Sequence, residues 1–224
     1  EFISEGFHQG GDHAEVVAIK AAKEFPTGAI IYVTLEPCNH QGKTPPCTDA
    51  IIKAGLSKVV FAVSDPNPVA TGGAQRLQDA GIVVVAGLGE IEARHDNRAW
   101  LTKVELDRPR VTWKIASTMD GKVTASDGSS KWITGEPARA DVAVMRSQAD
   151  AIVTSTATVI ADNPGLTAKG LGKNPVRIVM GVSELSKDLQ ILGNDAETLL
   201  IKSQDFRELI NVSKDRGFNS LMIE

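Results

Sequence analysis

A chain of 224 residues is long enough for one large or two small domains, and its 42% hydrophobic and 23% charged residues are ordinary for a globular protein. The formal net charge is −4, and neither residues 1–107 (9 Lys and Arg against 14 Asp and Glu) nor residues 108–224 (15 against 14) form the basic field expected for nucleic-acid binding. The sequence contains no apolar run long enough to span a bilayer, and its first residues lack the basic and apolar regions of a signal peptide. We therefore expect a cytoplasmic protein with neither a nucleic-acid nor a membrane partner.

Short apolar runs alternate with helical patterns in the first half of the chain. The runs predict strands at 29–35, 58–63 and 82–87, and the helical patterns cover 13–25, 45–55, 72–81 and 90–106. Gly55 and Gly81 stand where two of these helices should end. Strands that alternate with helices of this length form parallel βαβ units, so the pattern predicts an α/β sheet with helices on both faces.

The sequence DRPR at 107–110 predicts a domain boundary, because proline disfavours helix at the residue before it. We expect two domains, residues 1–107 and 108–224. The second continues the α/β pattern, with strands expected at 110–117, 150–155, 176–181, 198–203 and 220–224 and helices at 136–148 and 205–216. The chain begins without a strand before its first helix and stops on an apolar run, so we expect it to be incomplete at both ends.

Both cysteines of the chain, Cys38 and Cys47, lie in the loop TLEPCNHQGKTPPC at 34–47. A disulfide, two buried apolar thiols and a metal site are three interpretations of this placement. A reducing compartment disfavours the disulfide, whereas burial is the usual fate of an isolated cysteine. A metal site needs a third ligand, which His13 would supply from the sequence HAE at the start of the first predicted helix.

Topology favours the metal interpretation. Cys38 follows the predicted strand 29–35, while His13 and Cys47 open predicted helices, and these strand ends and helix starts face one crevice in an open α/β sheet. Three protein ligands leave zinc one open position for a water, whose proton Glu15 would take and pass on. The pattern H-x-E, then P-C and a second Cys, is typical of zinc-dependent deaminases, although their two cysteines are usually closer together.

Longer motifs give a specific resemblance. HAEVVAI, YVTLEPCNHQGKTPPC and DPNP (65–68) resemble the deaminase domain of the bifunctional deaminase/reductase family of riboflavin biosynthesis. The reductase domain of that family is similar to KIASTMDGKVTASDGSSKWITG (114–135), ARADVAVMRSQADAIVTSTATVIADNPGLT (138–167) and LMIE. The resemblance implies a cytidine-deaminase-like zinc domain followed by a dihydrofolate-reductase-like domain.

Two consecutive reactions are implied by this resemblance. The substrate, 2,5-diamino-6-ribosylamino-4(3H)-pyrimidinone 5′-phosphate, would lose its 2-amino group by hydrolysis at a Zn2+ site, and NADPH would then reduce the ribosyl chain to ribityl. The family also implies a homo-oligomer that acts on a small phosphorylated pyrimidine. Two alternatives are a zinc deaminase of another nucleobase or nucleotide with a non-catalytic or differently specific second domain, and a regulatory protein with degenerate sites.

The resemblance implies functional roles for the residues at matching positions of this chain. In the deaminase domain the resemblance implies the zinc ligands His13, Cys38 and Cys47, the proton shuttle Glu15, and the substrate-binding residues His40, Lys43, Asp65 and Asn67. In the reductase domain it implies the catalytic residue Lys114, the substrate-binding residues Ser130, Arg146, Leu166, Lys169 and Glu224, and the NADP-contacting residues Ala116, Trp132, Thr158 and Asp162. Ordinary structural roles compete with these: DPNP is also a turn sequence, and Trp132 could be a core aromatic. Lys169 stands where the family often has arginine, so a point charge replaces a planar fork.

Overall fold

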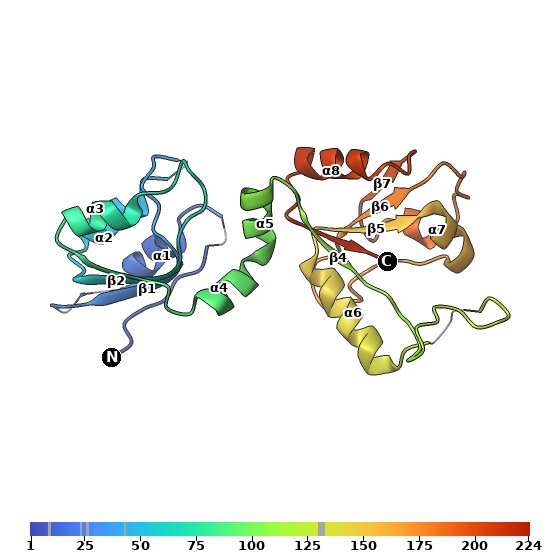
Figure 1. Ribbon diagram of the computed structural model, residues 1–224, viewed down its shortest axis with the longest axis horizontal. Coiled ribbons are helices and arrows are strands. Elements are labelled where there is room, and N and C mark those ends of the chain that lie inside the picture. The colour runs from blue at the N-terminus through green and yellow to red at the C-terminus, as the bar shows by residue number, and fades with distance from the viewer. Residues whose placement is uncertain (9, 23, 26, 43, 130–132) are drawn as a thin grey trace. The chain divides into compact units, whose positions relative to one another are not determined.

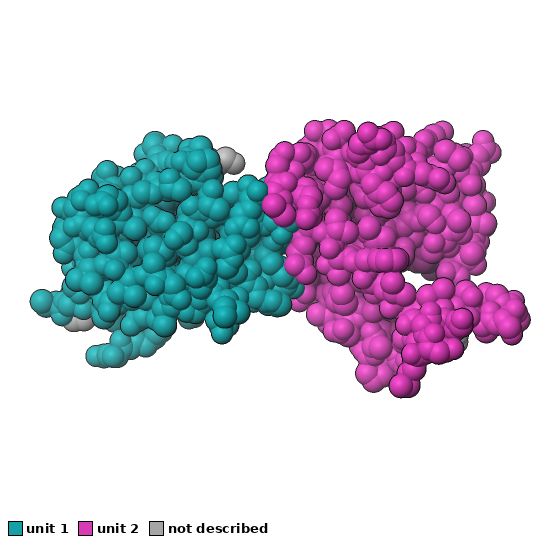
Figure 2. Space-filling view, in the orientation of Figure 1, with its two compact units in different colours: residues 1–105 teal, residues 106–224 magenta. Residues whose placement is uncertain are grey.

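The computed structural model describes residues 1–8, 10–22, 24–25, 27–42, 44–129 and 133–224. The predicted site residues Lys43, Ser130 and Trp132 lie outside these ranges. Two compact units make up the chain, Glu1–Glu105 and Leu106–Glu224, and Figure 2 shows them in different colours. The boundary expected after residue 107 lies close to this division.

The first unit is built on a parallel sheet with the strand order β1-β2-β3 (Figure 1). Its elements are α1 (Ala14–Ala21), β1 (Ile30–Leu35), α2 (Cys47–Lys53), β2 (Lys58–Val63), α3 (Gly73–Asp79), β3 (Val83–Ala86) and α4 (Glu90–Asp96), with α5 (Arg98–Leu106) leading to the second unit. The central strand β2 is almost wholly buried, and Val59 and Phe61 share one apolar cluster with Ile51 of α2 and Leu77 of α3. On the two outer strands alternate side chains are exposed, with Tyr32 at 65% and Val83 at 58%, so the described residues cover one face of this sheet only in part.

Glycines end α2 and α3, as predicted. Gly55 and Gly81 follow the last turns with φ of 68° and 82°, a left-handed conformation that costs glycine little. Their backbone N–H groups donate to Ile52 and Gln78, which satisfies carbonyls that the helices leave unpaired. Each helix can therefore stop sharply and return the chain to the start of the next parallel strand.

The second unit holds a parallel sheet with the order β4-β8-β5-β6-β7. Its elements are β4 (Arg110–Trp113), α6 (Glu136–Gln148), β5 (Ala151–Ser155), α7 (Thr156–Asp162), β6 (Val176–Met180), the 3-10 helix η1 (Gln190–Leu192), β7 (Thr198–Ile201), α8 (Phe206–Asp215) and β8 (Ser220–Ile223). Side chains alternate across this sheet: Val153 packs in a cluster with Leu209 of α8, and its neighbour Ile152 packs in another with Val159 of α7. Helices thus cover both faces here, as Figure 1 shows for α8 and α6, and the predicted α/β class is confirmed.

Two helical predictions differ from the structure. The helix expected over 90–106 is two helices, because Asn97 stands between them and its side-chain amide donates to the Ala93 carbonyl at 3.1 Å, in competition with the backbone. The helix α7 was not predicted. It begins directly after β5, where Ser155 caps it by accepting a hydrogen bond from the Thr158 N–H at 3.1 Å. No helix in the described part of the chain has both the length and the apolar character needed to cross a membrane.

Candidate functional sites

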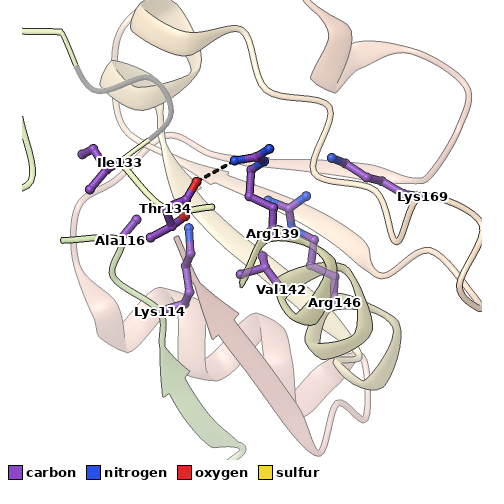
Figure 3. A pocket seen from close by; sticks show the side chains of 8 residues that line it. All are labelled: Lys114, Ala116, Ile133, Thr134, Arg139, Val142, Arg146 and Lys169. Carbon is purple, nitrogen blue, oxygen red and sulfur yellow. Dashed lines mark hydrogen bonds between the residues drawn. The ribbon is translucent and has the colours of Figure 1, made fainter. Parts of the chain in front are cut away.

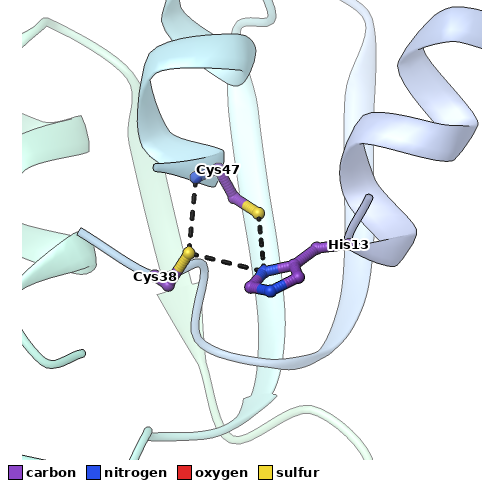
Figure 4. A group of neighbouring side chains, drawn as sticks. All are labelled: His13, Cys38 and Cys47. Carbon is purple, nitrogen blue, oxygen red and sulfur yellow. Dashed lines mark hydrogen bonds between the residues drawn. The ribbon is translucent and has the colours of Figure 1, made fainter. Parts of the chain in front are cut away.

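Three side chains with metal-ligand chemistry meet in the first unit, and Figure 4 shows them converging. His13 is the residue before α1, Cys38 follows β1, and Cys47 is the first residue of α2. The parallel topology brings these positions together, because strand ends and the starts of the following helices lie at the same edge of the sheet. The convergence predicted for His13, Cys38 and Cys47 is therefore present.

The spacing of the three ligand atoms fits zinc. His13 Nδ1 lies 3.5 Å from Cys38 Sγ and 3.3 Å from Cys47 Sγ, and all three atoms lie within 4.8 Å of one another. A tetrahedral zinc with bonds of about 2.3 Å to sulfur and about 2.0 Å to nitrogen would hold such atoms about 3.6 Å apart. One nitrogen and two sulfurs are also ligands that zinc prefers, and they leave a fourth position for water or substrate.

Both cysteines are free thiols, so the disulfide interpretation is wrong. Cys47 is fully buried and Cys38 nearly so, within a small cluster that includes Ala70. The pKa of Cys38 is lowered to about 5, chiefly because the side chain of Cys47 hydrogen-bonds to its sulfur and the Cys47 backbone N–H donates to it at 3.4 Å. The same hydrogen bond, followed by burial, raises the pKa of Cys47. Cys38 is thus prepared as a thiolate, the form that binds metal.

Glu15 lies beside the three ligands but is not one of the residues whose ligand atoms converge. It lies in the first turn of α1, is partly buried, and hydrogen-bonds with the Cys47 side chain. Burial is the largest cause that raises the pKa of this carboxyl group. A carboxyl group with a raised pKa next to a metal position is suited to accept and release a proton.

The sequence DPNP folds as a turn beside the ligands. Asp65 is buried and accepts the Asn67 N–H at 2.9 Å, while the Asn67 side chain accepts the Val69 N–H at 3.1 Å. Burial, then the negative charge of Glu36, raises the pKa of Asp65, whereas nearby His40 lowers it. The buried Nδ1 of His40 has no hydrogen-bond partner among the described residues. The turn interpretation is therefore correct, and it places Asp65 near His40.

Glu36 contributes to this site although the sequence did not single it out. Its buried carboxylate accepts the N–H of Ala74 at 2.9 Å and the N–H of Asp65 at 3.3 Å. Glu36 therefore ties the turn after β2 to the start of α3. The position of Glu36 in the sequence, directly after an apolar strand and two residues before Cys38, could have indicated that it belongs to the site.

The second unit contains a pocket rich in positive charge (Figure 3). It is lined by Lys114, Ala116, Ile133, Thr134, Arg139, Val142, Arg146 and Lys169. Four of these side chains are cationic, a composition that favours an anionic ligand such as a phosphate ester. Arg139 and Arg146 project from the same side of α6, and Arg139 donates to the Thr134 carbonyl.

One carboxylate organises two of the pocket cations. Glu224, directly after β8, accepts two hydrogen bonds from Arg146 at 2.8 and 2.7 Å, and its Oε2 lies 3.7 Å from Lys114 Nζ. Arg146 also donates to the Thr167 carbonyl at 3.3 Å. Lys114, Arg146 and Glu224, which were predicted from three distant motifs, thus lie together.

The remaining predicted residues of the second unit have different surroundings. Ala116 and Lys169 line the pocket, whereas the Leu166 side chain is buried in the apolar cluster with Val159 and is not among the lining residues. Thr158 and Asp162 lie on α7, away from the pocket lining. The sequence did not single out Arg139 and Thr134; Arg139 stands two helical turns before Arg146, a spacing that puts both on one helix face.

Comparisons with known proteins fit both sites. The family described as RibD C-terminal domain matches residues 109–224, and the cytidine and deoxycytidylate deaminase zinc-binding region matches residues 3–63. The riboflavin biosynthesis protein RibD of Mycobacterium tuberculosis is 46% identical over 213 residues, which are 92% of this chain and 63% of that protein. That of Aquifex aeolicus is 39% identical over 230 residues, covering 100% of this chain and 65% of the relative. The chain thus spans somewhat less than two thirds of these curated relatives.

Solved structures give the same result. A Thermotoga maritima diaminohydroxyphosphoribosylaminopyrimidine deaminase/5-amino-6-(5-phosphoribosylamino)uracil reductase superposes with a TM-score of 0.92 at 36% identity, over 100% of this chain and 70% of that one. Acinetobacter baumannii RibD superposes with a TM-score of 0.88 at 37% identity over the same shares of the two chains. Both units therefore have the fold, in the same order, of these two structures.

Proposed function

The chain belongs to the family of the riboflavin biosynthesis protein RibD, and on that premise we propose that it is a bifunctional enzyme, a zinc-dependent pyrimidine deaminase and an NADPH-dependent reductase. The substrate is the diaminopyrimidinone ribosylamine phosphate implied by the motifs. The observation that carries the proposal is the presence of one chemically suitable site in each unit: His13, Cys38 and Cys47 with Glu15, and the cationic pocket around Glu224.

Deamination requires water to replace the 2-amino group. The water oxygen bonds to the ring carbon, the C–N bond breaks, and ammonia leaves. His13, Cys38 and Cys47 would hold Zn2+, which when bound lowers the pKa of a coordinated water to about 7. Glu15 takes a proton from the attacking water and delivers it to the departing nitrogen.

The substrate of the deaminase is held by the loop beside the ligands. His40 offers a buried nitrogen that is unpaired within the described part of the chain, and Asp65 and Asn67 stand at the neighbouring turn. Lys43 belongs to the same loop in the sequence. Polar ring edges and a phosphate need hydrogen-bonding and cationic partners of this kind.

Reduction of the ribosyl chain to ribityl takes up one hydride and one proton. The cofactor NADPH, when bound, would supply the hydride, and the Lys114 ammonium, paired with Glu224, supplies the proton. Arg146 and Lys169 bind the phosphate of the substrate, and Ser130, Leu166 and Glu224 complete the substrate-binding set. Their chief contribution is to orient the substrate against the cofactor.

The nicotinamide cofactor is held by the predicted set Ala116, Trp132, Thr158 and Asp162. Ala116 lines the cationic pocket, whose charges suit the phosphates of NADPH as well as that of the substrate. The Thr158 hydroxyl lies 3.0 Å from Ser155 Oγ at the start of α7, so a polar surface follows the end of β5. These observations support a cofactor that extends from the pocket toward α7.

The protein also self-associates in this proposal. In the second unit β4 forms one edge of the sheet, and its side chains Val111 and Trp113 are 40% and 73% exposed. A second copy of the chain would bury this strip and pair the edge strand. Trp113→Glu should therefore lower the molecular mass measured by light scattering. We place the enzyme in the cytoplasm, where a reducing environment keeps Cys38 and Cys47 as thiols.

One preparation tests both activities. Bound zinc is quantified, and the diaminopyrimidinone ribosylamine phosphate is supplied with and without NADPH. We expect one zinc per chain, release of ammonia without NADPH, and oxidation of NADPH only after deamination. Ammonia release without NADPH oxidation would leave a deaminase whose second unit does something else. Absence of zinc and of ammonia release would contradict the deaminase assignment.

A further inference from the structure

Arg177 is a charged residue in an apolar layer of the second unit. It lies on β6 and is 0% exposed, the largest fully buried side chain in the described part of the chain. Its partner in the register with β5 is Ile152, and it shares its face of the sheet with Val179, two positions on. Both neighbours belong to the apolar cluster beneath α7. Burying a charge there is costly, so its retention calls for a physical reason.

The guanidinium group joins separate segments of backbone. Nη1 donates to the Gly165 carbonyl at 3.2 Å, Nη2 donates to the Gly193 carbonyl at 2.6 Å and also to that of Ala196, and Nε donates to Thr198 Oγ1 at 2.9 Å. Among the described residues, all hydrogen-bond acceptors of Arg177 are neutral oxygens. Burial lowers the pKa of Arg177, and the charge of Asp195 opposes that shift.

The segment that contains Gly165 is strained. In this segment, residues 163–169, which we call the pocket loop, Asn163, Leu166 and Lys169 have φ of 45°, 48° and 50°. Residues other than glycine rarely adopt this left-handed backbone conformation. It persists where the surrounding structure imposes it. The pocket loop must therefore be held from outside.

Besides the bond from Arg146 to the Thr167 carbonyl, three contacts hold the pocket loop in the described structure. Arg177 binds the Gly165 carbonyl, the Asn174 side chain accepts the Ala168 N–H at 2.9 Å, and the Gln190 N–H donates to Asn163 Oδ1 at 2.8 Å. Asn174 also donates to the Asp195 carbonyl at 2.9 Å. Asn174 and Arg177 therefore both bind the backbone of residues 193–196. The loop is thus fixed at its start, middle and end.

Two residues of the pocket loop connect it to the cationic pocket. The Thr167 carbonyl, two residues after Gly165, accepts a hydrogen bond from Arg146 at 3.3 Å. Lys169, at the end of the loop, lines the pocket itself. A shift of the loop backbone would therefore displace Lys169 and remove one of the two partners that orient Arg146, the other being Glu224.

We propose that Arg177, with Asn174, is a positioning residue that holds the pocket loop so that Arg146 and Lys169 present their charges to the phosphate of the reductase substrate. The inference rests on the proposed reductase function and adds two residues to it. An apolar side chain at position 177 would fill the volume without burying a charge, but only the planar fork of arginine reaches carbonyls on several segments at once.

The test combines steady-state kinetics of reduction with hydrogen exchange, both measured on the full chain. Arg177→Lys keeps the charge but loses the fork, and Asn174→Ala releases the other end of the loop. For both variants we expect KM for the deaminated ribosylamine phosphate to rise on the order of tenfold, with kcat changed less than about twofold. Amide exchange in residues 165–169 should become faster. Ammonia release by the first unit should be unchanged.

Thr198→Val is the matched control. It removes the acceptor of Arg177 Nε and the hydroxyl that donates to the Ile191 carbonyl at 2.6 Å, neither of which touches the pocket loop, and so tests loss of hydrogen bonds around the guanidinium without loss of the bond to Gly165. We expect it to lower thermal stability while KM and loop exchange stay at their wild-type values. A purely structural role for Arg177 would instead lower kcat with the folded fraction and leave KM unchanged.

Two outcomes would overturn the inference. Unchanged KM and unchanged loop exchange in Asn174→Ala would do so even if Arg177→Lys failed to fold. A similar rise of KM in Thr198→Val would show that any buried defect near β6 has the same effect. If the wild-type chain oxidised no NADPH, the proposed function would fail, and the exchange of residues 165–169 would still decide whether Arg177 and Asn174 hold the loop.

Discussion

Arg146 and Glu224 lie 78 positions apart in the sequence and face each other through two parallel hydrogen bonds, from Nε to Oε1 at 2.8 Å and from Nη2 to Oε2 at 2.7 Å. The two side chains are only 14% and 9% exposed. Such a bidentate pair fixes orientation as well as distance, and it needs the planar fork of arginine. β8 is thereby attached to α6 at the cationic pocket.

Glu224→Gln should destabilise the second unit. The variant keeps one acceptor but removes the charge and turns a donor toward Arg146, so the guanidinium is left without its carboxylate. We expect the free energy of unfolding to fall by about 1–3 kcal/mol, measured by urea denaturation. Glu197→Gln is the control, because the exposed pair of Glu197 with Arg216 contributes little. An equal loss in both variants would mean that burial of the Arg146 pair has no special effect.

Lys114→Ala should separate the two reactions. The amino group of Lys114 lies 3.7 Å from Glu224 and lines the cationic pocket, so under the proposed function its removal should slow NADPH oxidation on the order of a hundredfold. Ammonia release should be unaffected, because the deaminase ligands lie in the other unit. Lys122→Ala, at an exposed lysine, is the control and should keep both rates. Parallel loss of both activities in Lys114→Ala would indicate a folding defect.

Glu15→Gln should abolish deamination while zinc is retained. The amide keeps the size of the side chain but cannot carry the proton, so ammonia release should fall at least a hundredfold. Metal analysis should still find one zinc per chain. Cys47→Ser, which alters a ligand, should lose zinc and lower the melting temperature, because metal binding stabilises only the folded site. Turnover retained in Glu15→Gln would remove that residue from its proposed role.

Asp65 should make stability depend on pH. Its pKa is raised above the ordinary 3.8, chiefly by burial, so the folded protein binds this proton more tightly than the unfolded chain does. The resulting stabilisation is complete below the unfolded pKa and disappears as pH rises through the folded pKa. Asp65→Asn should therefore gain stability relative to wild type as pH rises above about 4. Melting temperatures of both proteins measured from pH 4 to 8 test this, and a constant difference between them would contradict it.

The strands were predictable because burial leaves a direct mark on composition. Each described strand lies within an apolar run that had been predicted as a strand, and the run at 58–63 coincides with β2. Ends were less predictable, since the run at 110–117 continues beyond Trp113, where pairing with β8 stops. Pairing partners far away in the sequence, rather than local composition, decide where a strand ends.

Some residues of the sites could likewise be predicted from the sequence, and others could not. His13, Cys38 and Cys47 could be placed together from the sequence, because they stand at strand ends and helix starts that any parallel sheet brings to one edge. Arg177 could not be recognised, because its function depends on the carbonyl groups of Gly165, Gly193 and Ala196, which meet only in the folded unit. Backbone groups leave no trace in side-chain motifs.

The position of β8 in the sheet determines the order in which the second unit can assemble during synthesis. β8 lies between β4 and β5, and among the described strands β4 pairs with β8 alone. β5, β6 and β7 can pair as soon as they emerge from the ribosome, but β4 has to wait until residues 220–223 have followed. Glu224 is the next residue, so Lys114 and Arg146 meet their carboxylate only once β8 has been made. A nascent chain stalled before β8 would hold a partial sheet with an open edge, and its cationic pocket would lack Glu224. Pulse-labelling of stalled chains would detect this state by the protease sensitivity of β4.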